Sequence, residues 1–317
     1  MTDLPTYAEL QSRQAEPPGS AWGLFGPHDE IGALNIVGPF EVVAASRLVR
    51  KGAVFSLDYP LNAFPPTPRR LAAVHTVIET GPNWRDDYVD RFYLQQTSQV
   101  DGLRHVRHPA HGFYGGADPA RVVADDPTIG VNRWADRGIV GRGVLIDVAR
   151  YRERAGRPLD HAGGEPITAD LLDETLAAQG VSLGPGDLLL IRTDYPSYLA
   201  TLGGPHPAAV AGLEQSRDML AWLWDHRIPL VASDNSALEC IPIVPTSPFH
   251  TGDGDHRDGL MHPELIALLG MVVGELWRLD DLAVDCADDG IYEFQLVVKP
   301  LNLVGAVGSP PNATAIK

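Results

Sequence analysis

Several features that would assign a chain to a large protein class are missing here. Only two cysteines occur among the 317 residues, Cys240 and Cys286, and their spacing fits neither a disulfide framework nor a zinc ribbon. No apolar run is long enough to cross a bilayer, and residues 1–5 lack the basic and apolar regions of a signal peptide. These absences predict a cytoplasmic protein.

Positive charge is also scarce. The chain has 25 Lys and Arg against 41 Asp and Glu, which gives a formal net charge of -16, and no run of basic residues interrupts this excess. Because such a surface repels polyphosphates and anionic lipids, we expect neither nucleic acid nor a membrane as a partner. The sequence contains no Walker loop and no Gly-x-Gly-x-x-Gly fingerprint, which argues against the usual nucleotide-binding classes. A small molecule is the expected ligand.

Strand and helix patterns alternate along the chain. With 44% hydrophobic and 21% charged residues, the composition is that of a globular domain able to bury a core. Short apolar runs bounded by Gly, Pro and Asp predict buried strands at residues 143–149, 187–193 and 229–234. Apolar residues at helical spacing predict helices at residues 39–50, 168–179 and 213–226. This alternation predicts an α/β fold.

The two ends of the chain differ from this pattern. Residues 1–38 predict an extended N-terminal arm, rich in Pro and Gly at its start, with one short helix near residues 7–13. Residues 39–317 then form a single domain. The stretch 291–298 alternates apolar and polar residues in its first half, which predicts a half-exposed strand at a sheet edge or in a second sheet.

The segment 95–105, Gln-Gln-Thr-Ser-Gln-Val-Asp-Gly-Leu-Arg-His, is the strongest candidate for a functional site. If it forms a strand, its side chains at 95, 99, 101 and 105 all point to one side. Two amides, one carboxylate and one imidazole then converge, which fits a metal or catalytic site. Polar residues on one strand face more often contact solvent, so the residues alone leave both interpretations open.

Two other motifs are weaker. Residues 180–184 satisfy Gly-x-Ser-x-Gly, but the serine-hydrolase elbow needs a strand before it and a helix after it, and the predicted order here is the reverse. His105, His108 and His111 are spaced by three residues on a segment broken by Pro109 and Gly112. This segment predicts a loop with exposed imidazoles rather than a metal site.

Several segments, in the right order, resemble the cyclase family of metal-dependent hydrolases, which includes bacterial kynurenine formamidase and isatin hydrolase. The family signature is His-x-Gly-Thr-His-x-Asp-x-Pro-x-His. This chain keeps its Asp as Asp101 and its last His as His105, but has Gln95 and Gln99 at the first two histidines and Leu103 at the proline. The further similar segments are residues 22–23, 29–35, 186–193, 262–277 and 308–312. The resemblance implies a swivelling β/β/α fold.

The resemblance also implies a metal site in which residues 95–105 meet a second cluster. Considered alone, His262 before Pro263 is an ordinary helix-start residue and Glu275 an ordinary surface charge. On the family pattern they join the ligands, and His105 becomes the general acid–base group or a hydrogen-bonding neighbour of the ligands. The implied metal ligands are Gln95, Gln99, Asp101, His262 and Glu275.

The two glutamines affect the expected metal. An amide oxygen is a harder and weaker donor than imidazole, so the affinity for zinc should fall relative to a His-rich site. We therefore expect one divalent ion, manganese or zinc, with magnesium as a further alternative, rather than a two-zinc centre.

Aromatic residues suggest the kind of substrate. The candidate substrate-binding residues are Trp22, Phe25, Tyr93, Phe113 and Tyr114, although each of them taken singly fits a core position equally well. Together with the resemblance they predict hydrolysis of an amide or lactone in an aromatic or cyclic substrate by metal-activated water. The alternative is a metal-free small-molecule-binding protein that retains the fold. Family analogy further implies a homodimer or homotetramer.

Overall fold

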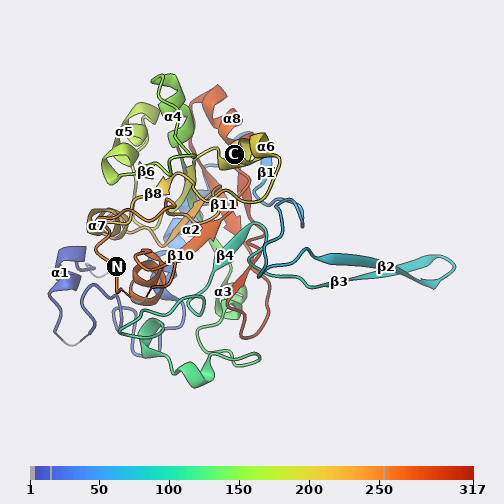
Figure 1. The fold of residues 1–317 in the computed structure, drawn as a ribbon, viewed down its shortest axis with the longest axis horizontal. Coiled ribbons are helices and arrows are strands. Elements are labelled where there is room, and N and C mark those ends of the chain that lie inside the picture. Colours follow the sequence, from blue (N-terminus) through green and yellow to red (C-terminus); the bar gives the residue numbers. More distant parts are fainter. Residues whose placement is uncertain (1–3, 15, 253) are drawn as a thin grey trace.

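A computed structural model describes residues 4–14, 16–252 and 254–317. Its centre is a nine-stranded sheet with the strand order β1-β13-β11-β5-β7-β9-β10-β4-β12 (Figure 1). Strands β5, β7, β9 and β10 run parallel to one another, and the strands beyond them on both sides pair antiparallel. The bounds are β1 Val54–Ser56, β4 Gln99–Asp101, β5 Ile139–Asp147, β7 Leu188–Arg192, β9 Leu230–Ser233, β10 Val272–Glu275, β11 Glu293–Val298, β12 Gly308–Ser309 and β13 Thr314–Ile316.

Helices and two small strand pairs complete the fold. The helices are α1 Tyr7–Gln11, η1 Gly32–Ile36, α2 Pro39–Ser46, η2 Tyr114–Gly116, η3 Pro119–Arg121, α3 Val131–Arg137, α4 Val148–Arg154, α5 Ala169–Gln179, α6 Tyr195–Leu202, α7 Arg217–Asp225, η4 Pro263–Leu268 and α8 Asp280–Asp289. The small pairs are β2 Val74–Gly81 with β3 Trp84–Asp90, and β6 Pro166–Ile167 with β8 Gly212–Leu213. None of the described helices combines the length and apolar composition that a bilayer crossing requires.

The predicted central strands are confirmed, and their burial explains their sequence pattern. Residues 188–191 of β7 are all buried, but Leu188 and Leu190 pack in one core cluster while Leu189 and Ile191 pack in another. Because alternate residues of a strand point to opposite faces, the sheet has an apolar core on both sides. A strand buried on both faces reads as a continuous apolar run.

Capping residues decide where the predicted helices begin and end. Helix α5 starts after Thr168, whose hydroxyl accepts a hydrogen bond from the Leu171 amide at 3.2 Å, and it ends at Gly180 with φ of 69°. Helix α7 begins at residue 217 rather than 213, because the Ser216 hydroxyl caps it by accepting from the Met219 amide at 3.1 Å. The predicted start of this helix is therefore wrong by four residues.

Two strand predictions need correction. Strand β11 lies inside the large sheet, between β5 and β13, and not at an edge or in a second sheet, since the short segment β13 pairs along its outer side. In the segment 95–105 only Gln99–Asp101 is a strand. The chain turns directly after it, where the Gly102 amide donates to the Val307 carbonyl and the His105 amide donates to the Gly102 carbonyl.

The predicted N-terminal arm, of which residues 1–3 and 15 lie outside the described part, runs along the body. The Ala21 amide donates to the Leu268 carbonyl at 2.9 Å, and the Ala33 amide donates to the Gly270 carbonyl at 2.8 Å. Gly32 has φ of 72°, and a Cβ there would lie 2.2 Å from the Gly270 oxygen. This close approach ties the N-terminal segment to the chain that follows η4.

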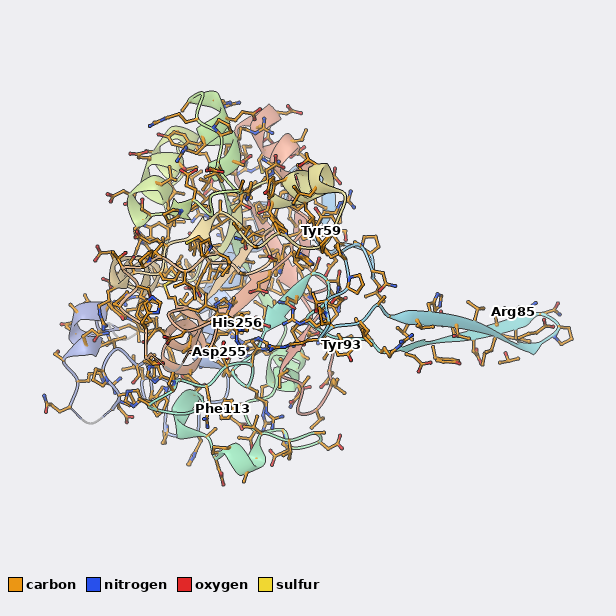
Figure 2. The ribbon with its side chains drawn as sticks, viewed as in Figure 1. Tyr59, Arg85, Tyr93, Phe113, Asp255 and His256 are labelled. Carbon is orange, nitrogen blue, oxygen red and sulfur yellow. The ribbon has the colours of Figure 1, made fainter. Side chains whose placement is uncertain are left out.

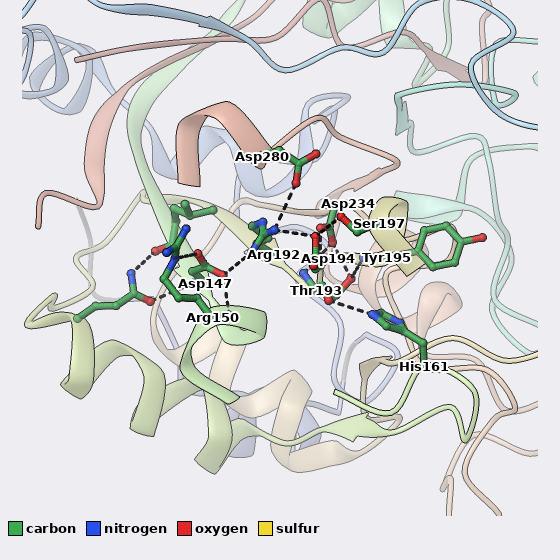
Figure 3. Close-up of polar contacts among 12 residues, drawn as sticks. Asp147, Arg150, His161, Arg192, Thr193, Asp194, Tyr195, Ser197, Asp234 and Asp280 are labelled. Carbon is green, nitrogen blue, oxygen red and sulfur yellow. Dashed lines mark hydrogen bonds and ion pairs between the residues drawn. The ribbon is translucent and has the colours of Figure 1, made fainter. Parts of the chain in front are cut away.

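A polar network joins the carboxyl ends of β5, β7 and β9 (Figure 3). The Arg192 guanidinium contacts Asp147 at 3.1 Å and Asp194 at 2.7 Å. The fully buried Asp234 carboxylate accepts from the backbone amides of Thr193 and Asp194, both at 2.8 Å. Asp194 has φ of 64°, so these bonds hold a strained turn at the end of β7.

Candidate metal centre

Three buried residues from distant parts of the chain meet at one end of β4. Asp101 belongs to β4, Glu275 ends β10, and His262 directly precedes η4. One potential ligand atom of each lies within 4.8 Å of the others. Strand pairing explains the arrangement, because Glu275 lies opposite Gln99 in the antiparallel register, so Gln99, Asp101 and Glu275 share a face.

The imidazole of His262 is held between two carboxylates. Its Nδ1 lies 2.5 Å from Glu239 Oε1, and its Nε2 lies 3.2 Å from Glu275 Oε1. Burial by itself would lower the pKa of His262, but the hydrogen bonds and charges of Glu239 and Glu275 raise it well above the usual value. A carboxylate on Nδ1 fixes the ring so that Nε2 points into the site, as in many metal centres.

Glu239 is a site residue that the sequence analysis missed. It is fully buried, and its second oxygen accepts from the Met261 amide at 2.7 Å, which also fixes the backbone next to His262. The sequence feature that could have identified Glu239 is its position as a single carboxylate between the apolar residues Leu238 and Cys240. A charge in that position is rarely left buried without a partner.

The centre contains buried acceptors without hydrogen-bond partners among the described residues. These atoms are Asp101 Oδ1 and Gln99 Oε1. The Gln99 side-chain amide donates through Nε2 to Glu275, which leaves its oxygen without a partner. Each such buried acceptor costs about 1–3 kcal/mol unless a donor or cation compensates it. Carboxylate and amide oxygens together with one imidazole nitrogen form a donor set suited to a divalent cation.

Burial also affects the protonation of Asp101. It raises the pKa of this carboxyl, whereas the nearby charges of His105 and Arg70 oppose the rise. A bound cation would favour the ionised form in the same way. The residues present therefore fit a metal ion.

Two of the predicted site residues lie beside the three buried groups. The Gln95 side-chain amide lies over Gly308, which is the cross-strand partner of Asp101. A Cβ added at Gly308 would lie 2.4 Å from Gln95 Nε2. Gln95 Nε2 is buried and has no partner among the described residues. His105 lies in the turn after β4, with Nδ1 3.6 Å from Asp101 Oδ1 and 24% of its side chain exposed. His105 thus reaches both Asp101 and the surface.

The five aromatic residues predicted to bind substrate lie in different surroundings. Trp22 and Tyr114 are buried in the core, and their polar atoms bond inside the protein. The indole of Trp22 donates to the Ala267 carbonyl at 2.7 Å, and the Tyr114 hydroxyl donates to Asp29 at 2.8 Å. Both rings support the region of η4 rather than lining a site.

The other three aromatic residues are scattered. Phe25 lines an open surface cleft that Arg133 and Arg137 also border. Tyr93 is 39% exposed and Phe113 is half-buried, and Figure 2 shows them apart from one another. No single surface collects these side chains.

A different aromatic cluster borders the metal centre. Its members are Tyr59, Phe64, Tyr195 and His206. The cluster packs around Leu276, the residue after Glu275, and the Tyr59 amide donates to Ser98, whose hydroxyl donates to the Leu276 carbonyl. The Tyr59 and Phe64 rings meet edge to face with centroids 5.0 Å apart. Sequence reasoning missed the cluster because its members are far apart in the chain.

Comparisons with known proteins agree on one family. The family model described as "Putative cyclase" matches residues 55–240, more than half of the chain. A solved structure of a novel cyclase is 33% identical, with a TM-score of 0.80 over 94% of this chain and 99% of that one. No curated protein matches the chain.

Two isatin hydrolases share the fold at lower identity. Isatin hydrolase A from Labrenzia aggregata, bound to benzyl benzoate, is 18% identical with a TM-score of 0.56, over 86% of this chain and 94% of that one. An isatin hydrolase bound to the product analogue thioisatinate is 16% identical with a TM-score of 0.56, over 88% and 98%. The expected α/β fold is thus confirmed, and the chain belongs to the cyclase family.

Proposed function

We propose that the protein is a metal-dependent hydrolase that opens an amide or lactone bond in a small aromatic or cyclic substrate. The observation that carries the proposal is the buried centre of Asp101, His262 and Glu275, together with the buried Gln99 Oε1, which has no hydrogen-bond partner among the described residues. A divalent cation, manganese or zinc with magnesium as an alternative, would polarise a carbonyl there and lower the pKa of a water molecule. Gln99 Oε1 would be a further ligand of this cation, and Gln95 would support the edge of the site.

The chain's own residues supply orientation and proton transfer. Glu239 orients His262, and the Gln99 side-chain amide orients Glu275. His105 accepts the proton that the attacking water loses and returns it to the leaving group of the substrate. Its position supports this role, because it contacts Asp101 and is partly open to solvent.

Arg70 completes the rim of the site. Its guanidinium donates to the Gln95 carbonyl, it is half-buried, and its charge acts on Asp101. Opening an amide or a lactone creates a carboxylate, and a guanidinium is well suited to bind it. Arg70 therefore favours substrates whose product carries its new carboxylate near the metal centre.

The aromatic cluster supports an aromatic substrate. Half-buried Tyr59 packs against the cluster that contains Leu276, and its ring meets that of Phe64 edge to face. Two proteins of the same fold are isatin hydrolases, and one of them binds benzyl benzoate. Flat rings of this kind bury apolar area against aromatic side chains. A bicyclic amide or an aryl ester is therefore the first substrate class to test.

The test combines metal removal with a substrate screen. The protein is dialysed against a chelator, assayed with arylformamides, cyclic amides and lactones, and then assayed again after adding Mn²⁺, Zn²⁺ or Mg²⁺ separately. We expect turnover to disappear without metal and to return with at least one ion. The variant Asp101→Ala should lose both metal and turnover, whereas Glu264→Gln, at a half-buried carboxylate bonded to His108, should keep them. Equal turnover by the metal-free protein would contradict the proposal and favour a metal-free binding protein.

A further inference from the structure

Gln95 brings a buried hydrogen-bond donor without an acceptor to the metal centre. Its side-chain Nε2 is buried and has no hydrogen-bond partner among the described residues. Most buried polar atoms in proteins have a partner, and a buried N–H without one lowers the stability of the fold. An acceptor on a bound molecule would remove this cost. The position and surroundings of Gln95 indicate what that molecule is.

Strand pairing places this donor on the same face of the sheet as the candidate ligands. Gly308 is the cross-strand partner of Asp101, so a side chain at 308 would point to the same side as the Asp101 carboxylate. The Gln95 amide occupies that space, because a Cβ added at Gly308 would lie 2.4 Å from Nε2. Nε2 and the Asp101 carboxylate therefore face the same small volume.

The backbone around Gln95 is held in place, so the donor has a fixed origin. Arg70 donates to the Gln95 carbonyl. The next residue, Gln96, is buried, and its backbone amide donates to the Tyr93 carbonyl at 3.0 Å. Its side-chain Nε2 donates to the Pro65 carbonyl, also at 3.0 Å. A donor that is fixed before a substrate binds can stabilise a developing negative charge without a cost of reorganisation.

The donor distinguishes position 95 from position 99, although the family pattern implies a metal ligand at both. An amide oxygen can bind a cation, whereas an amide nitrogen only donates hydrogen bonds. At Gln99 the buried atom without a partner among the described residues is the oxygen, and at Gln95 it is the nitrogen. The two glutamines therefore present opposite groups to the centre, an acceptor suited to a cation and a donor suited to an oxygen of a substrate.

We propose that Gln95 is a catalytic residue whose Nε2 donates a hydrogen bond to the carbonyl oxygen of the substrate, an inference that rests on the proposed hydrolase function. Water adds to the carbonyl carbon and gives a proton to His105, while the electron pair of the C=O π bond moves onto the oxygen held by Gln95. The pair then re-forms the carbonyl, the bond to the leaving nitrogen or oxygen breaks, and His105 returns the proton to that atom. The donor stabilises the carbonyl oxygen most while this oxygen is negatively charged.

The first test asks whether Gln95 binds the metal instead. Gln95→Met keeps the length of the side chain and removes the donor, and Gln295→Met is the matched control at a half-buried glutamine of β11, which four strands separate from β4. Urea unfolding of the metal-free proteins and calorimetric titration with Mn²⁺ are measured for both variants. We expect Gln95→Met to be at least as stable as the wild type and to bind Mn²⁺ within about threefold, because it removes an unpartnered donor and no ligand. A larger loss of Mn²⁺ affinity, absent from the control, would identify Gln95 as a ligand and overturn the proposal.

The second test measures the binding of an oxygen by the Mn²⁺-loaded protein. Trifluoroacetophenone forms a tetrahedral hydrate that resembles the charged stage of hydrolysis, and its affinity is measured by calorimetry. A charge-assisted hydrogen bond contributes about 10- to 100-fold to affinity, so Gln95→Met should bind this probe more weakly by that factor. With the substrate that the metal screen identifies, kcat should fall by about 100-fold or more while KM changes by less than about threefold. Gln95→Glu, which keeps the size of the side chain and replaces the donor by an oxygen, should show the same losses, and Gln295→Met should show none.

The outcomes separate the role of Gln95 from the hydrolase function. Metal-dependent turnover that persists at the wild-type rate in both Gln95→Met and Gln95→Glu would overturn the donor role and leave the hydrolase function standing. A wild type that binds the probe through Gln95 but turns over no substrate would keep the donor and refute the hydrolase. A wild type that binds neither Mn²⁺ nor the probe would overturn both.

Discussion

Replacing Glu239 by glutamine would remove the charge that orients His262 and keep the size of the side chain. Glu239 is fully buried, and its two oxygens accept from His262 Nδ1 at 2.5 Å and from the Met261 amide at 2.7 Å. A glutamine offers one oxygen, so its amide nitrogen faces one of these two donors. The variant therefore loses one charge-assisted bond and leaves a buried N–H without an acceptor.

The magnitude of this change can be worked out for two quantities. An unsatisfied buried donor costs about 1–3 kcal/mol, so the free energy of unfolding should fall by roughly that amount. A hydrogen-bonding partner of a metal-binding histidine contributes about 10- to 100-fold to metal affinity. The raised pKa of His262 should also fall in the metal-free variant, because the bond to Glu239 is a main cause of that rise.

Three measurements check the prediction. Calorimetric titration of chelator-treated protein with Mn²⁺ gives the affinity, urea unfolding gives the stability, and NMR titration of the metal-free protein gives the pKa of His262. The matched control is Glu264→Gln, which lies close to His262 in sequence but contacts His108 at 3.2 Å. The reasoning is refuted if Glu239→Gln binds Mn²⁺ within about twofold of wild type and leaves the pKa of His262 unchanged.

Three further predictions concern the metal preference and the network at the strand ends. Gln99→His should shift the ratio of the dissociation constants towards zinc by about tenfold without altering the circular dichroism spectrum, and an unchanged ratio would show that residue 99 is no ligand. Arg192→Met should lower the free energy of unfolding by about 1.5–3 kcal/mol, since it removes a charge-assisted bond to the buried Asp147 carboxylate, which Arg150 still pairs at 3.1 Å, and a loss below about 1 kcal/mol in urea would contradict this. Burial raises the pKa of Asp234 from 3.8 to about 7, although hydrogen bonds from Thr193 oppose the rise. The folded state then keeps a proton that the unfolded chain loses, so stability should decrease between about pH 4 and pH 7, by up to about 4 kcal/mol. Asp234→Asn should lack this dependence, and a constant stability difference between wild type and variant over that range would count against it.

The sequence predicted well those elements whose limits are set by their own residues. The residues at the two ends of helix α5 themselves indicate where it begins and ends, because Thr168 can cap its start and only a glycine easily adopts the positive φ at position 180. Strands β7 and β9 can likewise be recognised as buried from their sequences alone, because both are short and continuous apolar runs. These features need no knowledge of which segment lies alongside.

Features that depend on pairing with distant segments were not predictable in the same way. The position of β11 inside the sheet depends on β13, a three-residue strand whose sequence carries little signal of its own. The aromatic cluster depends on residues from 59 to 206 reaching Leu276. In both cases the deciding interaction joins residues that are far apart in the chain, and single-sequence periodicity does not describe it.

The glutamine at position 99 shows how the structure changes the meaning of a substitution. Compared with the family signature, Gln99 is a histidine lost from the ligand set. In the folded chain its amide does two things at once, since Nε2 donates to Glu275 while Oε1 remains a buried acceptor beside Asp101. A side chain with no further function could hold Glu275 without leaving an acceptor uncompensated, and selection for stability alone would favour that arrangement. The unpartnered oxygen is therefore better explained by a cation than by decay of the site.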